Sequence, residues 1–313
     1  MKFVVFNVGG ALCTYAEHSG TQIVIDIGKG NDFSPVNDFL VPLYEKRNYR
    51  KTNGKYPISQ LIVSHPHKDH LSDIQDFDKY FAPYLITCPN DKTFPKSSKL
   101  NINWEAIDTP DDPDVKYLKR IIVSRSLPLK AVDTDHMIIS YLYPGAVEED
   151  EGLTNESYTN NVSIATYMNF GKYSVLLPGD LQKLGMQRLL NADDLISKAH
   201  DVALRKAISK GIDFLVCPHH GLRSSFSTAL FSCMKDGKTL KLNIISEKPT
   251  TEGDKRQVDS RYSTSDYCAG ENNLSTKELP VYQRKTSNGH IFVDEEGKVE
   301  LTNDVNHLIE LFG

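Results

Sequence analysis

The feature that most constrains this chain is a six-residue run rich in metal-binding side chains, His65-Pro66-His67-Lys68-Asp69-His70. Imidazole and carboxylate are the ligands that a borderline cation such as Zn²⁺ or Mn²⁺ takes in proteins. An apolar run at residues 61–63 precedes the motif, and a stretch of helical spacing at 71–81 follows it. Layered α/β folds place their active sites on such loops at strand ends. The run therefore predicts a metal centre; the alternative is a surface turn that happens to be rich in His and Asp.

Two later segments repeat this arrangement, because each places a potential ligand directly after an apolar strand. Residues 175–177 lead to Asp180, and residues 214–217 lead to His219 and His220. Taken alone, each has an ordinary structural explanation, such as a helix N-cap for Asp180. Three strand ends that converge on ligands are what a dinuclear site requires. Together they predict a centre for two divalent metal ions, Zn or Mn.

Short apolar runs alternate with turns and with stretches of helical spacing along the chain. Strands are expected at residues 3–6, 22–27, 60–63, 121–123, 137–143, 162–168, 174–177, 212–217, 242–245, 282–284 and 290–293. Helices are expected at 36–46, 71–81, 181–210 with a break near 191–194, and 305–312. An acidic loop is expected at 148–151 and a polar loop insertion near 248–275. This order predicts one α/β domain over residues 1–313, a sandwich with helices outside.

Composition excludes several classes of protein. Mean hydropathy is −0.39, and no apolar stretch approaches the roughly 20 residues that a membrane-spanning helix needs, so no membrane partner is expected. The five cysteines are odd in number and show no CxxC spacing, which predicts reduced thiols and a cytoplasmic protein. The net charge of −5 disfavours a surface coated with nucleic-acid-binding charge.

The order of these ligands resembles the metallo-β-lactamase superfamily, which implies a four-layered αββα sandwich. Within that superfamily the chain looks like the metallohydrolase domain of the ComEC/Rec2 competence proteins. The narrower likeness rests on motifs spread over nearly the whole chain. They are Asn7-Val8-Gly9, Ile25-Asp26-Ile27-Gly28, Asn160-Asn161-x-Ser163, Pro218-His219-His220-Gly221 followed by Ser224 and Ser225, Tyr282-Gln283-Arg284-Lys285-Thr286, and Gly289-His290-Ile291.

The resemblance implies a role for each member of the motifs. His65 and His67 would bind the first ion, and the ligands of the second would be Asp69, His70 and His220. Asp180 would bridge the two ions, and Asp26 would orient the ligand loop from outside, as carboxylates around metal sites commonly do. Asp69 and Asp180 would thus act in catalysis, and His219 would be free to touch the substrate.

This chain departs from the family pattern at two places. Many members carry a further His upstream of the bridging Asp, and this neighbourhood reads Thr159-Asn160-Asn161 here. The first ion would then be completed by Asn160 or by water. Relatives also usually have Ser where this chain has Leu222.

The implied reaction is hydrolysis by a metal-activated hydroxide. A bound dication lowers the pKa of its water to about 7, and two ions about 3.5–4 Å apart can direct the hydroxide at a phosphoryl or carbonyl centre. Arg223, Ser224 and Ser225 follow the last ligand and offer donors to a phosphate, although a solvent-exposed Arg without a role is equally common. We expect a phosphodiesterase, specifically a nuclease acting on DNA or RNA. The alternatives are a hydrolase of a small ester, lactone or amide, and a metal-binding protein without turnover.

Overall fold

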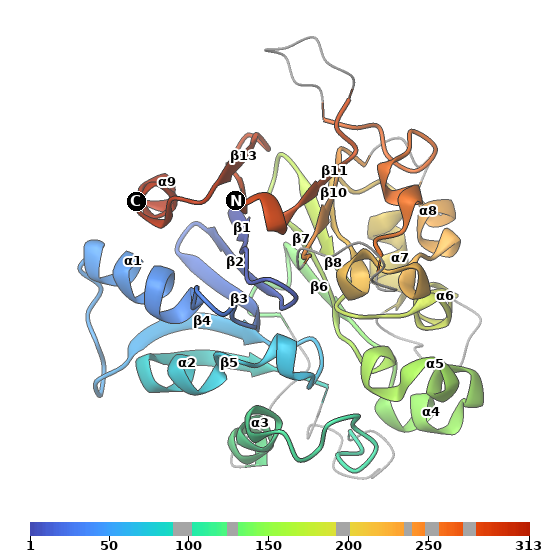
Figure 1. Ribbon diagram of the computed structural model, residues 1–313, viewed down its shortest axis with the longest axis horizontal. Helices are drawn as coiled ribbons and strands as arrows, with labels where there is room; N and C mark the ends of the chain where they lie inside the picture. Colours follow the sequence, from blue (N-terminus) through green and yellow to red (C-terminus); the bar gives the residue numbers. More distant parts are fainter. Residues whose placement is uncertain (90–101, 124–130, 192–200, 235–239, 248–256, 272–279) are drawn as a thin grey trace.

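Two β-sheets pack face to face, and helices cover the outer side of each (Figure 1). The computed structural model describes residues 1–89, 102–123, 131–191, 201–234, 240–247, 257–271 and 280–313. The predicted four-layered αββα sandwich is confirmed.

The first sheet has seven strands in the order β13-β12-β1-β2-β3-β4-β5. Their bounds are β1 Lys2–Val5, β2 Cys13–His18, β3 Thr21–Ile27, β4 Tyr56–Ile62, β5 Phe81–Thr87, β12 His290–Val293 and β13 Val299–Thr302. β3, β4 and β5 are parallel, and the other neighbours are antiparallel. Because β3 is covered on both faces, its side chains are almost all buried, as is usual for parallel strands.

The second sheet has six strands in the order β11-β10-β9-β8-β7-β6. Their bounds are β6 Met137–Ser140, β7 Ala165–Asn169, β8 Ser174–Leu177, β9 Phe214–Val216, β10 Leu242–Ile245 and β11 Gln283–Lys285. β8, β9, β10 and β11 run parallel. Since the carboxyl ends of parallel strands meet at one edge, the loops after β8 and β9 lie together, as do those after β3 and β4 in the other sheet.

The helices of the described residues lie outside the sheets. They are α1 Val41–Lys46, α2 Ile74–Tyr80, α3 Pro113–Val123, α4 Pro144–Glu149, α5 Glu151–Asn161, α6 Lys183–Leu190, α7 Asp201–Ile208, α8 Thr228–Cys233 and α9 Val305–Phe312. The terminal helix shows why they pack there, because its apolar face carries Phe312 onto Tyr15 and Phe39, with ring centroids 5.2 and 5.5 Å apart. No helix in the described ranges is both long and apolar enough to cross a membrane.

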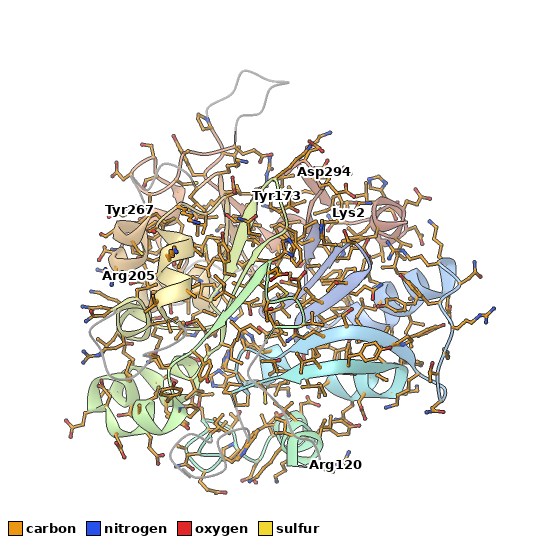
Figure 2. The ribbon with its side chains drawn as sticks, turned by 180° about the vertical axis from the view of Figure 1, so that it is seen from behind. Lys2, Arg120, Tyr173, Arg205, Tyr267 and Asp294 are labelled. Atoms are coloured by element: carbon orange, nitrogen blue, oxygen red, sulfur yellow. The ribbon has the colours of Figure 1, made fainter. Side chains whose placement is uncertain are left out.

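Side chains fill the space between the sheets, as the view from behind shows (Figure 2). Phe3 of the first sheet meets Tyr173 and Phe214 of the second in a group of edge-on and tilted rings, with centroids 5.2–6.0 Å apart. Such aromatic contacts add to the burial of apolar area. They hold the sheets together at the end where β1 and β8 begin.

Two expected elements are wrong. The strand expected at 121–123 is the end of helix α3, because Ile121 and Ile122 continue a helical stripe that includes Val115 and Leu118, all of them buried. The acidic loop expected at 148–151 is instead the junction of α4 and α5, where the Asp150 side chain caps α5 by accepting from the N–H groups of Gly152 and Leu153.

Three strands gave too little sequence signal to be expected. β5 contains Pro83 and alternates poorly, which is typical of the edge strand that it is. β2 carries Glu17 and His18, and β13 is only half-buried.

Helices were expected over 36–46 and over 181–210. In the first range a π-helical turn, Pro35–Leu40, runs directly into α1, and in the second range α6 ends at Leu190.

The polar insertion near 248–275 lies partly outside the described residues. Its described part contains a short 3-10 turn, Ser260–Ser263, and two of its side chains, Tyr262 and Cys268, are fully buried. Tyr262 packs against Phe226, with ring centroids 4.9 Å apart. This part of the insertion therefore contributes to the core and is not only a surface loop.

Candidate metal centre

The predicted ligands lie together at the edge where four strands end. Asp26 is at the end of β3, the His65–His70 motif follows β4, Asp180 follows β8, and His219 and His220 follow β9. The two sheets thus bring together residues that are more than 150 positions apart in the chain.

Glycine allows the loops to approach this closely. Gly179 has φ +62°, and a Cβ there would lie 2.9 Å from the Ser64 Cβ and 3.0 Å from the Ser163 Cβ. A Cβ on Gly28 would lie 2.0 Å from the backbone oxygen of Asp69. The Gly179 loop therefore packs closely on two serine side chains, and the Gly28 loop packs on the backbone of the ligand motif.

The first ligand set consists of His65, His67 and Asp180, whose ligand atoms lie within 4.8 Å of one another. His65 Nε2 is 3.0 Å from His67 Nδ1 and 3.9 Å from Asp180 Oδ2. His65 and Asp180 are buried and His67 is partly exposed. Three nitrogen and oxygen atoms therefore face one point.

The second ligand set consists of Asp69, His70 and His220 and meets the same distance limit. His220 Nε2 lies 3.2 Å from Asp69 Oδ2, and His70 Nε2 lies 3.2 Å from Asp180 Oδ1. Asp180 therefore turns Oδ2 toward the first ligand set and Oδ1 toward the second. This is the geometry of a bridging carboxylate.

The residues fit a divalent cation. His70 Nε2 and Asp180 Oδ1 are buried, and neither makes a hydrogen bond within the described residues although they lie 3.2 Å apart. Buried polar atoms without partners are rare, and a bound ion is one of the reasons they persist. Imidazole with carboxylate is the donor set of Zn²⁺ and Mn²⁺ sites.

Hydrogen bonds from outside fix the second ligand set. Asp26 accepts from the Ser64 N–H at 2.7 Å, from the Ser64 hydroxyl at 2.8 Å and from His70 Nδ1 at 2.8 Å. Asp26 has φ +56°, a conformation uncommon outside glycine that is often retained at functional sites. His220 Nδ1 donates to the Ser246 carbonyl at 3.0 Å. Asp26 thus contacts the ligand loop from outside, through Ser64 and His70.

The sequence and the geometry lead to the same family. The profile of the metallo-beta-lactamase superfamily matches residues 6–220, which span the complete set of ligands. The chain belongs to this superfamily. No curated protein has a matching sequence.

Solved structures of similar shape are distant in sequence. The metallo-beta-lactamase fold protein YhfI from Bacillus subtilis is 12% identical over 80% of this chain and 87% of its own, with a TM-score of 0.36. A diphosphatase of the PhnP family is 9% identical over 96% of this chain and 99% of its own, with a TM-score of 0.39. Yeast PDE1 is 12% identical over 82% and 90%, with a TM-score of 0.36. Similarity this low says nothing about the reaction.

The histidines around the candidate metal centre keep the Asp180 carboxylate ionised. Burial opposes ionisation of Asp180, but His70 and His65 lower its pKa well below the usual range. Burial likewise opposes charge on His70, and Asp180 with Asp26 raises its pKa well above the usual range. Burial lowers the pKa of His65. Neutral His65 and ionised Asp180 are in the states that metal ligation requires, whereas His70 would have to release a proton when an ion binds.

His219 stands beside the first ligand set without joining it. Its Nε2 lies 3.8 Å from Asp180 Oδ2, and its Nδ1 lies 3.3 Å from the Ser224 hydroxyl. Its side chain is 22% exposed, whereas His220 is tied to Asp69 and the Ser246 carbonyl. The structure therefore separates the two adjacent histidines, with His220 inside the second ligand set and His219 at the edge of the first.

The residues predicted to bind substrate differ in accessibility. Arg223 and Ser224 are exposed, but Ser225 is fully buried and its hydroxyl has no hydrogen-bond partner among the described residues. Ser225 is therefore out of reach of a substrate that approaches from solvent. Asn160, in the place of the missing family His, is 4% exposed, and its Oδ1 has no hydrogen-bond partner in the described ranges.

Three contacts at the centre were not predicted from the sequence. Asp108 Oδ2 lies 3.0 Å from His67 Nε2, although the residues are 41 positions apart. The Ser246 carbonyl is a backbone group, which no residue pattern marks. Ser163, which accepts from the Asp180 N–H at 3.1 Å, appeared only as part of a motif. Asp108 lies in a polar segment without periodicity, so only the folded structure reveals it.

A groove of about 810 Å³ leads away from Asp69. Its walls are the loops at residues 7–11 and 29–33, and Lys29, Lys68 and Ser72 also line it. Lys68 is 67% exposed, and Lys29 is 38% exposed beside Asp73. The groove is thus open and lined by both polar and apolar groups, and its two ammonium groups each lie within ion-pair distance of an aspartate, Lys29 of Asp73 and Lys68 of Asp112.

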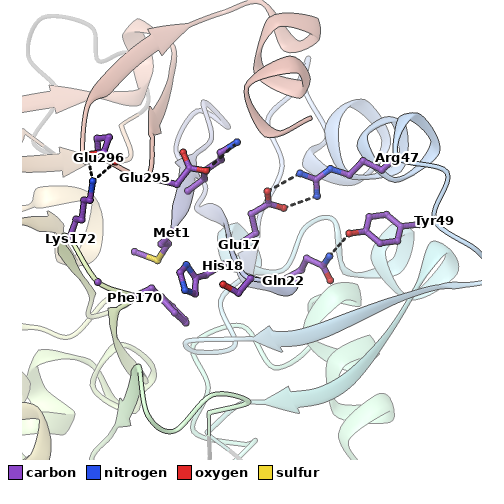
Figure 3. A pocket seen from close by; sticks show the side chains of 14 residues that line it. Met1, Glu17, His18, Gln22, Arg47, Tyr49, Phe170, Lys172, Glu295 and Glu296 are labelled. Atoms are coloured by element: carbon purple, nitrogen blue, oxygen red, sulfur yellow. Dashed lines mark hydrogen bonds and ion pairs between the residues drawn. The ribbon is translucent and has the colours of Figure 1, made fainter.

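A second hollow, of about 460 Å³, lies at the end of strands β3 and β8 opposite to the metal centre (Figure 3). It is lined by the β2–β3 turn, the β7–β8 turn and the start of β1. Its charged side chains pair with each other: Arg47 binds Glu17 through two hydrogen bonds, and Lys172 binds Glu296. The hollow is remote from the ligands because β3 and β8 begin there and end at the metal centre.

Proposed function

We propose that this protein is a metal-dependent phosphodiesterase that cleaves nucleic acid, using two divalent ions, Zn or Mn. The observation that carries the proposal is the open groove that leads from Asp69 past Lys68 and Lys29. A phosphodiester chain needs an extended path with cationic donors beside the reacting phosphate. A small lactone or β-lactam would be held better in an enclosed pocket.

The protein's own side chains would divide the work of hydrolysis. Bound divalent ions supply Lewis acidity, which makes hydroxide available at neutral pH and neutralises charge on the phosphoryl group. Asp180, with one oxygen toward each ligand set, would fix the separation between them. The Asp26 carboxylate would keep His70 in the orientation that leaves its Nε2 free.

His219 and Arg223 would contact the substrate. His219 Nε2 faces Asp180 from the edge of the centre, and the Ser224 hydroxyl contacts its Nδ1, so Nε2 is placed to hydrogen-bond the leaving oxygen. Arg223 is exposed on the same loop and can pair with a phosphate in bidentate fashion. Among family members, the motifs favour the ComEC/Rec2-type metallohydrolase domain. The five free cysteines suit a reducing cytoplasm.

A substrate comparison tests the proposal. Metal-loaded protein is assayed on an aryl phosphodiester, single- and double-stranded DNA, RNA and a chromogenic β-lactam, with Zn²⁺ and Mn²⁺ separately. We expect phosphodiester cleavage that a chelator stops, and DNA cleavage that falls steeply with salt as bound counterions are released. Rapid β-lactam or lactone turnover without phosphodiester cleavage under either metal would overturn the proposal.

The groove has its own test. Lys68→Ala should raise KM for DNA several-fold more than KM for the aryl phosphodiester, because only the longer substrate follows the groove. The matched control is Lys172→Ala, which removes a similarly exposed ammonium at the far end of the strands. Equal effects of the two changes on KM would show that DNA does not follow the groove.

A further inference from the structure

Each ligand histidine uses one ring nitrogen for the centre and turns the other toward a polar group outside it. His70 meets Asp26, and His220 meets the Ser246 carbonyl. His65 Nδ1 lies 3.1 Å from the Ser64 hydroxyl. His67 has the fourth such contact, since its Nε2 lies 3.0 Å from Asp108 Oδ2. An imidazole that ligates a metal usually needs this outer partner to fix its tautomer and its orientation.

We propose that Asp108 is the positioning residue of the first metal ion, acting through His67. The His67 Nδ1 atom lies 3.0 Å from His65 Nε2, so Nδ1 faces the point shared by the first ligand set. An N–H on Nε2, donated to Asp108, leaves the Nδ1 lone pair free for the ion. A carboxylate in this place also makes the imidazole a stronger ligand. The inference rests on the proposed metal centre and not on the proposed substrate.

The fold holds the Asp108 carboxylate in place. Its backbone N–H donates to the Thr159 hydroxyl at 2.9 Å, and its Oδ2 accepts from the Ser157 hydroxyl at 3.3 Å. Thr159 is fully buried, and Ile107, next to Asp108, is 3% exposed. The segment is therefore fixed on α5, next to Asn160, at the place where the family His is missing.

Exposure distinguishes Asp108 from Asp26. The Asp26 side chain is fully buried, whereas that of Asp108 is 52% exposed. Water and dissolved salt weaken the electrostatic interaction of an exposed carboxylate with its partner. The first ion should therefore be the more easily lost of the two, and its affinity should depend on Asp108.

Metal titration of variants tests the inference. Protein is stripped with a chelator and titrated with Co²⁺, whose visible absorption reports the ligand geometry, and bound metal is counted by elemental analysis. Asp108→Ala should weaken one of the two binding steps about 10–100-fold and change its absorption spectrum, leaving the other step unchanged. Asp108→Asn, which keeps an acceptor but loses the charge, should have a smaller effect.

The matched control is Asp111→Asn, which removes an exposed carboxylate three residues away that pairs with Lys116 at 2.7 Å. It should leave both steps unchanged, and thermal melting of each apo variant checks the fold. If Asp108→Ala unfolds the protein, Asp108→Asn carries the test. An unchanged titration, or equal weakening of both steps, would overturn the role of Asp108. Failure to bind any metal in the parent protein would instead refute the metal centre itself.

Discussion

The two ligand sets of the centre are supported by different parts of the fold. Around the second ligand set, a fully buried carboxylate, Asp26, and a backbone carbonyl at Ser246 hold the histidines. Around the first, the half-exposed Asp108 holds His67, and Asn160 stands where the family has a His. Preorganised ligands bind more tightly because less order is imposed on binding. Two ligand sets that both face Asp180 therefore need not bind metal with equal strength.

The largest effect is expected at the residue that belongs to the second ligand set and lines the groove. Asp69→Asn keeps the side-chain volume but removes a charged ligand, so turnover should fall by more than the roughly 100-fold that outer contacts cost. Steady-state kinetics measures the loss, and circular dichroism should show the fold retained. Activity within a few-fold of the parent would mean that the site assignment is wrong.

His219 and His220 are adjacent in the chain but are expected to differ in their effect on metal binding. His220→Ala should lower the metal content by about one ion per chain, because His220 is inside the second ligand set. His219→Ala should keep both ions and lower turnover, since His219 lies outside both sets. Elemental analysis of the two variants decides. Equal metal loss would show that the division between them does not hold.

Acid protonates groups in the core of the fold as well as the metal ligands. The effect of pH on folding stability therefore has to be measured separately. Burial lowers the pKa of His290 to about 4, and its Nδ1 accepts from the Asn7 N–H at 3.0 Å, in a loop that lines the groove. Below pH 6.5 the unfolded chain binds a proton that the folded chain does not, so stability falls as the pH drops from 6.5 toward 4. At pH 5 this titration lowers the free energy of unfolding by about 2 kcal/mol.

His290→Asn keeps an acceptor for Asn7 and removes the titration. Its free energy of unfolding, measured with urea from pH 7 to pH 4.5, should fall less steeply than that of the parent. The metal-free protein is used for both, so that ligand protonation contributes equally. Parallel curves would show that His290 does not titrate in this range.

The smallest change is expected from restoring the family pattern. Asn160→His restores the imidazole that the family pattern has at this position and should tighten the weaker metal-binding step about tenfold, because imidazole is a better ligand than a neutral amide for Zn²⁺. The competing effect is crowding, since Asn160 is buried. Metal titration alongside the Asp108 variants measures it. A weaker step in Asn160→His would mean that the first ligand set does not extend to this position.

The sequence predicted the parts of the molecule that local patterns encode. The ligands were recognisable because metal-binding residue types followed apolar strands, and the sandwich followed from the same alternation. Ile121 was misassigned because a short apolar run fits a strand and a helix equally well. Asp108 and Ser246 could not be predicted, because their contacts depend on how distant segments pack. The accessibility of Ser225 likewise required the structure.

Gly179 illustrates a cost that falls on a residue with no chemistry of its own. Its missing side chain lets the Asp180 loop rest on Ser64 from one sheet and Ser163 from the other. Any larger residue would shift Asp180, and because the Asp180 oxygens face both ligand sets, the shift would disturb both together. Mutational tolerance around this centre is therefore low even at a position that no ligand list would include. A deep mutational scan selected on metal retention should find Gly179 as intolerant as Asp180.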